Sequence, residues 1–328
     1  MTDDSLPPIE LHAPDISRWK GGGSGVDWVH VLDSGRPGPK AMVQALTHGN
    51  EICGAIALDW LLSRQGDWAV SSGRLTVAFG NIAAHARWNP ADPDRSRYAD
   101  EDFNRVWADD VLHGSRDSLE RRRARALRPF VDAADLLLDI HSMHQACSPI
   151  MVCGTTGRGG EKGAALSRRL GVPGTLLIDT GHPAGLRMIE RGGFGDPASE
   201  RTALLVECGQ HWEAAAADVA KDTLLRFLRE AGSLDDAFVA PALARIGRQP
   251  PVTQRLVRVT EAVVAESLDF RFVRDFQGLE VIEHAGELIA TDGQRRIVAP
   301  YDNTVLVMPS MSHLKVGTTM VRLGRFDD

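Results

Sequence analysis

Two histidines and one glutamate have the types and the spacing to bind a single divalent metal ion. His48 and Glu51 stand three residues apart in the run THGNE, and His141 follows the apolar run DLLLDI. A zinc ion that activates water takes three protein ligands and keeps one coordination position open. His48, Glu51 and His141 are therefore candidate ligands for one Zn²⁺ per chain, although a His-x-x-Glu pair alone is a common pattern.

A second glutamate, Glu207, follows the apolar run ALLV and is a candidate general acid/base. A carboxylate at the end of a buried strand costs free energy unless it is paired, hydrogen-bonded or functional. Beside a zinc-activated water it would take the water proton and pass it to a leaving amine. The alternative is a glutamate that forms a salt bridge at the rim of a sheet.

Asp139 precedes His141 by two residues, so both side chains can lie on one face of a strand. It would then accept a hydrogen bond from the second ring nitrogen of a ligand histidine. A buried aspartate that caps a helix or pairs with an arginine is an equally good interpretation of the sequence.

The elements that must position these residues alternate between strands and helices. Short apolar runs predict strands, and longer stretches with apolar residues three and four apart predict helices. The predicted strands are residues 41–48, 74–81, 134–141, 148–154, 174–181 and 202–212, and the predicted helices are 52–66, 118–133, 161–171 and 218–232. This alternation predicts an α/β sheet with helices on both faces. Open sheets of this kind bind ligands at the carboxyl ends of their strands, where the candidate residues stand.

The pattern changes after about residue 240. Pro241, Pro250 and Pro251 predict a linker, and the runs that follow are short and strand-like, separated by Gly, Pro, Asp and Asn. We therefore predict a zinc-dependent catalytic domain over residues 1–240 and a small all-β domain over residues 241–328.

Composition and charge restrict the partners and the compartment. The net charge of -7 argues against nucleic acid, because phosphate binding needs a concentrated basic surface. The initial run MTDDSLPPIELHAPD lacks the parts of a secretory signal, and no apolar stretch is long enough to span a membrane. Four cysteines without CxxC spacing predict reduced thiols. We expect a cytoplasmic protein without a nucleic-acid or membrane partner, and assembly into a homo-oligomer stays open.

Four sequence pieces together resemble the succinylglutamate desuccinylase/aspartoacylase family of the zinc carboxypeptidase-like, M14-type metallohydrolases. The pieces THGNEICG, NPADPDRSRYADEDFNRVW, DLLLDIHS and LLVECG occur in the family's order between residues 47 and 209. The second piece is the most specific, because NP, RY and a D-x-D step followed by NR rarely occur together by chance. The resemblance implies a zinc carboxypeptidase-like mixed sheet flanked by helices and a zinc hydrolase that cleaves amide bonds.

The resemblance also implies a role for each matching residue, and the metal ligands and Glu207 keep the roles given above. Arg97 matches the arginine that polarises the scissile carbonyl. Asn104 and Arg105 match the pair that binds a substrate carboxylate. Asp102 would brace this loop and contact a ligand histidine. The alternative for both arginines is a salt bridge within the loop to one of three aspartates, Asp94, Asp100 and Asp102.

Three features depart from the family pattern. The third ligand is followed by SMHQ instead of a small polar residue, so His144 either contacts the substrate or is an exposed loop histidine. A further substrate arginine is expected before the catalytic glutamate; Arg187 is the first candidate, and Arg191 and Arg201 are the alternatives. Tyr301 is the only tyrosine late in the chain, and its context matches the family poorly.

The expected function is zinc-dependent cleavage of the amide bond in an N-acyl amino acid or a related small molecule that carries a carboxylate. One alternative is a metallocarboxypeptidase-like peptidase, or an amidase that acts on a larger acylated metabolite. A non-catalytic zinc-containing protein that binds small molecules is disfavoured, because structural zinc is usually closed by four ligands, often cysteines.

Overall fold

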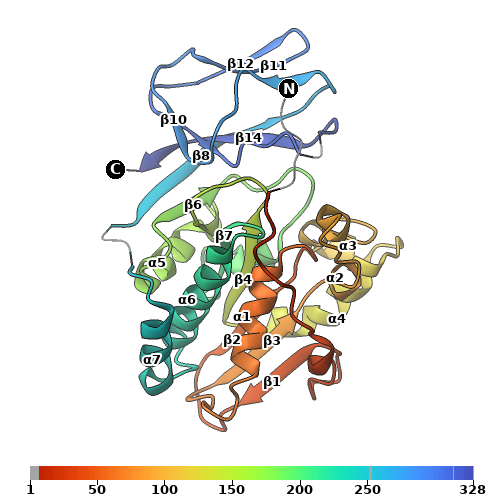
Figure 1. Ribbon diagram of the computed structural model, residues 1–328, viewed down its shortest axis with the longest axis vertical. Coiled ribbons are helices and arrows are strands. Elements are labelled where there is room, and N and C mark those ends of the chain that lie inside the picture. The colour runs from red at the N-terminus through yellow and green to blue at the C-terminus, as the bar shows by residue number, and fades with distance from the viewer. Residues whose placement is uncertain (1–6, 251–252, 313, 328) are drawn as a thin grey trace.

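The computed structural model describes residues 7–250, 253–312 and 314–327. Within them, a mixed 11-stranded sheet has the strand order β1-β3-β2-β4-β7-β5-β6-β8-β14-β13-β10. A separate three-stranded antiparallel sheet has the order β12-β11-β9. Figure 1 shows the helices packed around the first part of the large sheet and the smaller sheet at the far end of the molecule.

Each strand or helix predicted before residue 240 coincides with an element whose bounds lie within four residues of the prediction, and further elements occur outside the predicted runs. The strands of the large sheet are β1 (Val29–Asp33), β2 (Lys40–Ala45), β3 (Arg74–Phe79), β4 (Leu136–Met143), β5 (Ile150–Thr155), β6 (Thr175–Asp179), β7 (Thr202–Gln210), β8 (Arg255–Val264), β10 (Glu280–Ile282), β13 (Thr304–Val307) and β14 (Thr319–Asp327). The smaller sheet contains β9 (Phe270–Phe272), β11 (Leu288–Asp292) and β12 (Arg295–Val298). The helices are α1 (Ile52–Leu62), α2 (Ile82–His85), α3 (Asp109–His113), α4 (Leu119–Ala133), α5 (Gly160–Leu170), α6 (Ala214–Glu230) and α7 (Asp236–Ile246).

Helices cover both faces of the sheet because successive side chains of a strand point to opposite sides. Val43 of β2 joins a core that includes residues of α1, α5, α6 and α7. Met42, its neighbour in the sequence, joins the second core, which includes Leu127 and Val131 of α4. The predicted α/β class, with a large mixed sheet flanked by helices and a smaller antiparallel sheet, is confirmed.

Helix α7 corrects part of the predicted linker. The helix begins after Asp235, whose side chain accepts a backbone hydrogen bond, and it ends at Gly247 in the left-handed conformation. Pro241 lies inside this helix, where both end caps and packing against the first core outweigh one missing backbone hydrogen bond. Pro250 follows the helix, and Pro251 lies outside the described residues.

The C-terminal strands continue the large sheet. β8 pairs in parallel with β6 and antiparallel with β14, and β13 and β10 extend the same sheet. The division of the chain into domains at residue 240 stays a prediction, and α7 runs across that position. No helix of the described residues is long and apolar enough to cross a bilayer. Residues 1–6 of the initial run lie outside the described residues.

Candidate metal centre and active site

His48, Glu51 and His141 converge from two neighbouring strands. β2 ends at Ala45, and the chain turns through Leu46, with a φ of 62°, to reach His48. Glu51 precedes the first turn of α1, and its side chain makes no capping hydrogen bond. His141 lies in β4, which pairs in parallel with β2. One ligand atom from each of the three residues lies within 4.8 Å of the others.

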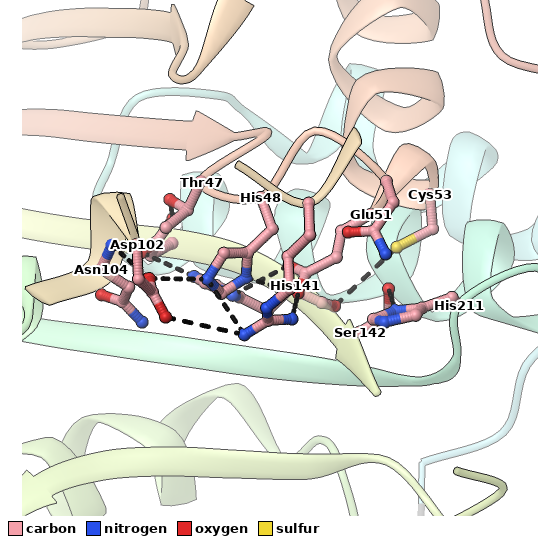
Figure 2. Close-up of polar contacts among 12 residues, drawn as sticks. Thr47, His48, Glu51, Cys53, Asp102, Asn104, His141, Ser142 and His211 are labelled. Atoms are coloured by element: carbon pink, nitrogen blue, oxygen red, sulfur yellow. Dashed lines mark hydrogen bonds and ion pairs between the residues drawn. The ribbon is translucent and has the colours of Figure 1, made fainter. Parts of the chain in front are cut away.

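The three ligand groups face one another in a buried space (Figure 2). Nδ1 of His48 lies 2.6 Å from one carboxylate oxygen of Glu51, and Nδ1 of His141 lies 2.9 Å from the other. The exposed fractions are 3% for His48 and 1% for both other residues. Two imidazoles and a carboxylate are donors that zinc accepts, and three protein ligands leave room for water or substrate. The residues therefore fit a hydrolytic zinc ion.

Both histidines contact a carboxylate through their second ring nitrogen. Nε2 of His48 lies 3.0 Å from Asp102, and Nε2 of His141 lies 2.8 Å from Asp139. The hydroxyl of Thr47 donates to the other oxygen of Asp139 at 2.8 Å. These contacts orient each ring with Nδ1 toward the common centre, and a proton on Nε2 would leave Nδ1 to bind a metal ion. Of the two interpretations of Asp139, contact with the ligand histidine is the one present.

A close approach at Gly49 joins the metal-binding turn to the loop that carries Arg97. A Cβ atom on Gly49 would lie 2.3 Å from the carbonyl oxygen of Ser96, so the contact requires glycine. The backbone N–H of Gly49 donates to the carbonyl of Arg97 at 3.1 Å. The Arg97 guanidinium lies 3.8 Å from Glu51 and 3.8 Å from Asp102. Arg97 therefore forms an ion pair within its own loop, with Asp102, and also lies beside the metal ligand Glu51.

Glu207 lies on β7, opposite His141 in the parallel register of β4 and β7. It lines the same cavity as the metal cluster. Its Oε2 atom is buried and has no hydrogen-bond partner among the described residues. Burial raises the pKa of Glu207 to about 7. A carboxylate with that pKa can take up and release a proton near neutral pH.

Asn104 and Arg105 line the cavity, which has a volume of ≈ 500 Å³. Both belong to one 3-10 turn, Phe103–Arg105. Oδ1 of Asn104 and Nε of Arg105 are buried and have no hydrogen-bond partner in the part of the chain that the structure describes. Burial lowers the pKa of Arg105 to about 10, which still leaves the guanidinium charged at neutral pH. These two side chains present unused polar atoms to a ligand.

Of the three candidate arginines before β7, only Arg187 lines the cavity. Its buried guanidinium lies 2.9 Å from Asp179 and 2.8 Å from Glu190. Burial would lower the pKa of Arg187, but these two carboxylates raise it above its usual value. Arg191 pairs with aspartates and Arg201 with backbone carbonyl groups, both away from the cavity. Arg187 therefore remains the candidate substrate contact, although several of its N–H donors already pair with Asp179 and Glu190.

His144 lies in the cavity wall and is half-buried, which differs from an exposed loop histidine. Its Nε2 atom lies 3.1 Å from Asp94, and its Nδ1 atom lies 3.1 Å from the hydroxyl of Ser312. The histidine thus connects the predicted substrate loop to the C-terminal part of the chain. Tyr301 lies outside the cavity wall, and its hydroxyl is 2.7 Å from that of Thr260.

The sequence itself matches a known catalytic domain. Residues 37–231, more than half of the chain, match the model of the succinylglutamate desuccinylase/aspartoacylase catalytic domain. The chain belongs to the succinylglutamate desuccinylase/aspartoacylase family. The resemblance inferred from the four sequence pieces is confirmed. The family is one of hydrolases, so membership is consistent with an enzyme that acts on amide bonds.

Solved structures share the fold of this desuccinylase/aspartoacylase family protein at low sequence identity. Succinylglutamate desuccinylase from Vibrio cholerae is 16% identical with a TM-score of 0.65, covering 91% of this chain and 85% of its own. The desuccinylase from Chromobacterium violaceum is 17% identical with a TM-score of 0.63, at coverages of 93% and 90%. The product-bound ectoine utilization protein EutE (DoeB) from Ruegeria pomeroyi is 19% identical with a TM-score of 0.60, at coverages of 96% and 92%. A comparison with curated protein sequences finds no match.

This family member also has cationic and imidazole groups in the cavity that the sequence did not single out. They are His182, His211, Lys315 and Arg322. Nε of Arg322 is buried without a hydrogen-bond partner in the described residues, and it lies 3.3 Å from Asp179. His211 stands four residues after Glu207, so its place in the run ECGQH could have marked it as a candidate site residue. No local signal marked Arg322, because only the pairing of β14 with β8 and of β8 with β6 brings it to the cavity.

Proposed function

We propose that the chain is a zinc-dependent deacylase that cleaves the amide bond of an N-acyl amino acid or a related small molecule bearing a carboxylate. The observation that carries the proposal is the convergence of His48, Glu51 and His141 in a cavity that also contains Glu207 and Arg97. Membership in a family named for removing succinyl and other acyl groups supports the reaction type. A zinc carboxypeptidase-like origin of the fold is part of the same proposal.

Each residue of the cavity has a role in this reaction. Zinc held by His48, Glu51 and His141 would supply a Lewis acid and an activated water. Glu207 takes the proton released as water attacks the amide carbonyl, and returns it to the amine nitrogen as the carbon–nitrogen bond breaks. Arg97 stabilises the negative charge that develops on the carbonyl oxygen. The products are a carboxylate and a free amine.

Asn104 and Arg105 support a substrate that carries a carboxylate. A buried polar atom without a partner costs free energy, and a ligand that supplies the partner removes this cost. The planar guanidinium of arginine binds a carboxylate through two parallel hydrogen bonds. In an N-acyl amino acid, the carboxylate of the amino acid would bind here, and the acyl arm would extend to the other side of the metal centre.

The C-terminal part of the chain favours a small substrate over a peptide or a larger acylated metabolite. Met308, Ser312 and Thr319 are among the residues that line the cavity, and Ser312 contacts His144. A volume of ≈ 500 Å³ is typical of sites for small molecules. Cytoplasmic location, which the four free cysteines support, and a homo-oligomer stay predictions.

The test combines metal analysis with product detection. The purified protein is expected to contain one zinc ion per chain and to release free amine from N-succinyl-L-glutamate, N-acetyl-L-aspartate or another N-acyl amino acid. Chelation should abolish the activity and added zinc should restore it. Release of amino acids from peptides alone would favour the peptidase alternative. A zinc-loaded protein that cleaves no amide substrate would contradict the proposal.

A further inference from the structure

His211 is a buried histidine of the cavity wall that the proposed reaction does not use. It follows β7, is 1% exposed, and lines the cavity of the metal centre. Its Nδ1 atom lies 2.8 Å from the hydroxyl oxygen of Ser142. Its Nε2 atom is buried and has no hydrogen-bond partner among the described residues. One ring nitrogen of this cavity-lining residue is therefore unsatisfied.

The contact with Ser142 indicates which nitrogen of His211 carries the proton. If the serine hydroxyl donates to Nδ1, the ring proton lies on Nε2, and one buried donor lacks a partner. In the opposite arrangement, both the serine hydroxyl hydrogen and the Nε2 lone pair lack a partner within the described residues. Unsatisfied buried groups are costly, so the first arrangement is favoured. His211 then presents an N–H donor at Nε2.

The surroundings hold the ring of His211 in place as a neutral donor. The backbone N–H of His211 donates to the carbonyl of Met143 at 2.8 Å. The rings of Trp212 and His144 pack around it, with centroid distances of 5.5 Å and 6.0 Å. Burial, together with nearby Arg97, lowers the pKa of His211 to about 3, so the ring is uncharged at neutral pH.

His211 lies at the end of the site away from the carboxylate-binding pair. Figure 2 shows Asp102 and Asn104 at one end of the cluster and Ser142 and His211 at the other, with the metal-binding histidines between them. A substrate with its amino-acid carboxylate at Asn104 and its amide at the metal centre must direct its acyl arm toward His211.

We propose that His211 is a specificity-determining residue whose Nε2–H donates to an oxygen acceptor on the acyl arm, beyond the scissile carbonyl. This inference rests on the proposed deacylase function. It assigns the preferred substrates to N-acyl amino acids whose acyl arm ends in a carboxylate or another oxygen acceptor, in preference to purely aliphatic acyl groups. Ser142 is a positioning residue in this arrangement, because it fixes the tautomer of the ring.

The test compares N-succinyl-L-glutamate with N-butanoyl-L-glutamate, which have acyl chains of equal length with and without a terminal carboxylate. We expect the zinc-loaded wild-type protein to prefer the succinyl substrate by roughly 10- to 100-fold in kcat/KM, mainly through KM. His211→Phe keeps an aromatic ring without the donor. It should reduce the preference to about 1 while the zinc content stays that of the wild-type protein. His284→Phe, at an exposed position, is the matched control.

A second variant keeps the test valid if His211→Phe fails to fold. Ser142→Ala removes the hydroxyl that holds the ring proton of His211 on Nε2. It should lower the succinyl preference by about 3-fold or more, with zinc content retained. An unchanged preference in the folded variants, or no preference in the active wild-type protein, would overturn the inference and leave the proposed function intact. If the zinc-loaded wild-type protein hydrolyses no N-acyl amino acid at all, the proposed function fails and this inference fails with it.

Discussion

Asp139 and His141 lie on the same face of β4, and Nε2 of His141 lies 2.8 Å from Oδ2 of Asp139. An N–H at Nε2 donates to this carboxylate, so Nδ1, which lies 2.9 Å from Glu51, is the nitrogen that would bind a metal ion. The aspartate therefore decides which nitrogen of the histidine is available to a metal ion, although Asp139 itself does not face the metal centre.

Asp139→Asn is expected to weaken zinc binding by about 10- to 100-fold. The asparagine can still accept from Thr47, but its amide N–H₂ would face Nε2–H of His141 and drive the ring proton to Nδ1. Competition with a zinc-binding dye measures the affinity. Asp135→Asn, just before β4 at an exposed position, is the control. Equal zinc affinity of Asp139→Asn and the wild-type protein would contradict this account.

Glu207→Gln is expected to retain its zinc but to lose about 10²- to 10⁴-fold in kcat. The amide has nearly the same size as the carboxylate and cannot carry the proton from water to the leaving amine. Metal analysis and steady-state kinetics of the same preparation separate the two effects. Glu200→Gln, an exposed position before β7, should behave as the wild-type protein does. Full activity of Glu207→Gln would exclude the proposed role.

Arg322→Met is expected to raise the KM for carboxylate-bearing substrates by about 10-fold, with a smaller effect on kcat. The guanidinium of Arg322 comes from β14, and its buried Nε atom has no hydrogen-bond partner in the described residues. Kinetics with an N-acyl amino acid and its carboxamide measure the effect. Arg325→Met, an exposed position on the same strand, is the control. A KM that rises equally for both substrates would show that the charge of Arg322 does not recognise the carboxylate.

Glu190 is expected to make the stability of the fold depend on pH in the acidic range. Burial would raise the pKa of Glu190, but Arg187 lowers it to about 2 from the usual 4.5. Its stabilising contribution is therefore complete above about pH 4.5 and is lost as the pH falls toward about 2. Glu190→Gln should lower the free energy of unfolding by about 3 kcal/mol at neutral pH and by about half of that near pH 3.

Urea denaturation of both proteins at the two pH values measures this difference for Glu190→Gln. Glu200→Gln, at an exposed position, should change the free energy of unfolding little at either pH. A difference between Glu190→Gln and the wild-type protein that does not change with pH would mean that the ionised carboxylate of Glu190 is not what stabilises the fold.

The sequence alone determined the α/β class and the candidate metal ligands. Apolar runs indicate which segments are buried strands. Polar residues at the ends of those runs indicate where a site can form. His48, Glu51 and His141 could be named because each stands beside such a run. The prediction of a linker at Pro241 was wrong, because the local propensity of proline does not reflect the packing and the end caps that stabilise α7.

Only the tertiary structure decided what surrounds those ligands. The choice among Arg187, Arg191 and Arg201 depended on which guanidinium faces the cavity, and all three stand in similar local sequence. Arg322 reaches the site through strand pairing across more than 100 residues of chain, and His211 is distinguished by an unsatisfied nitrogen. Contacts of this kind depend on distances between segments that are remote in sequence. Neither composition nor periodicity predicts those distances.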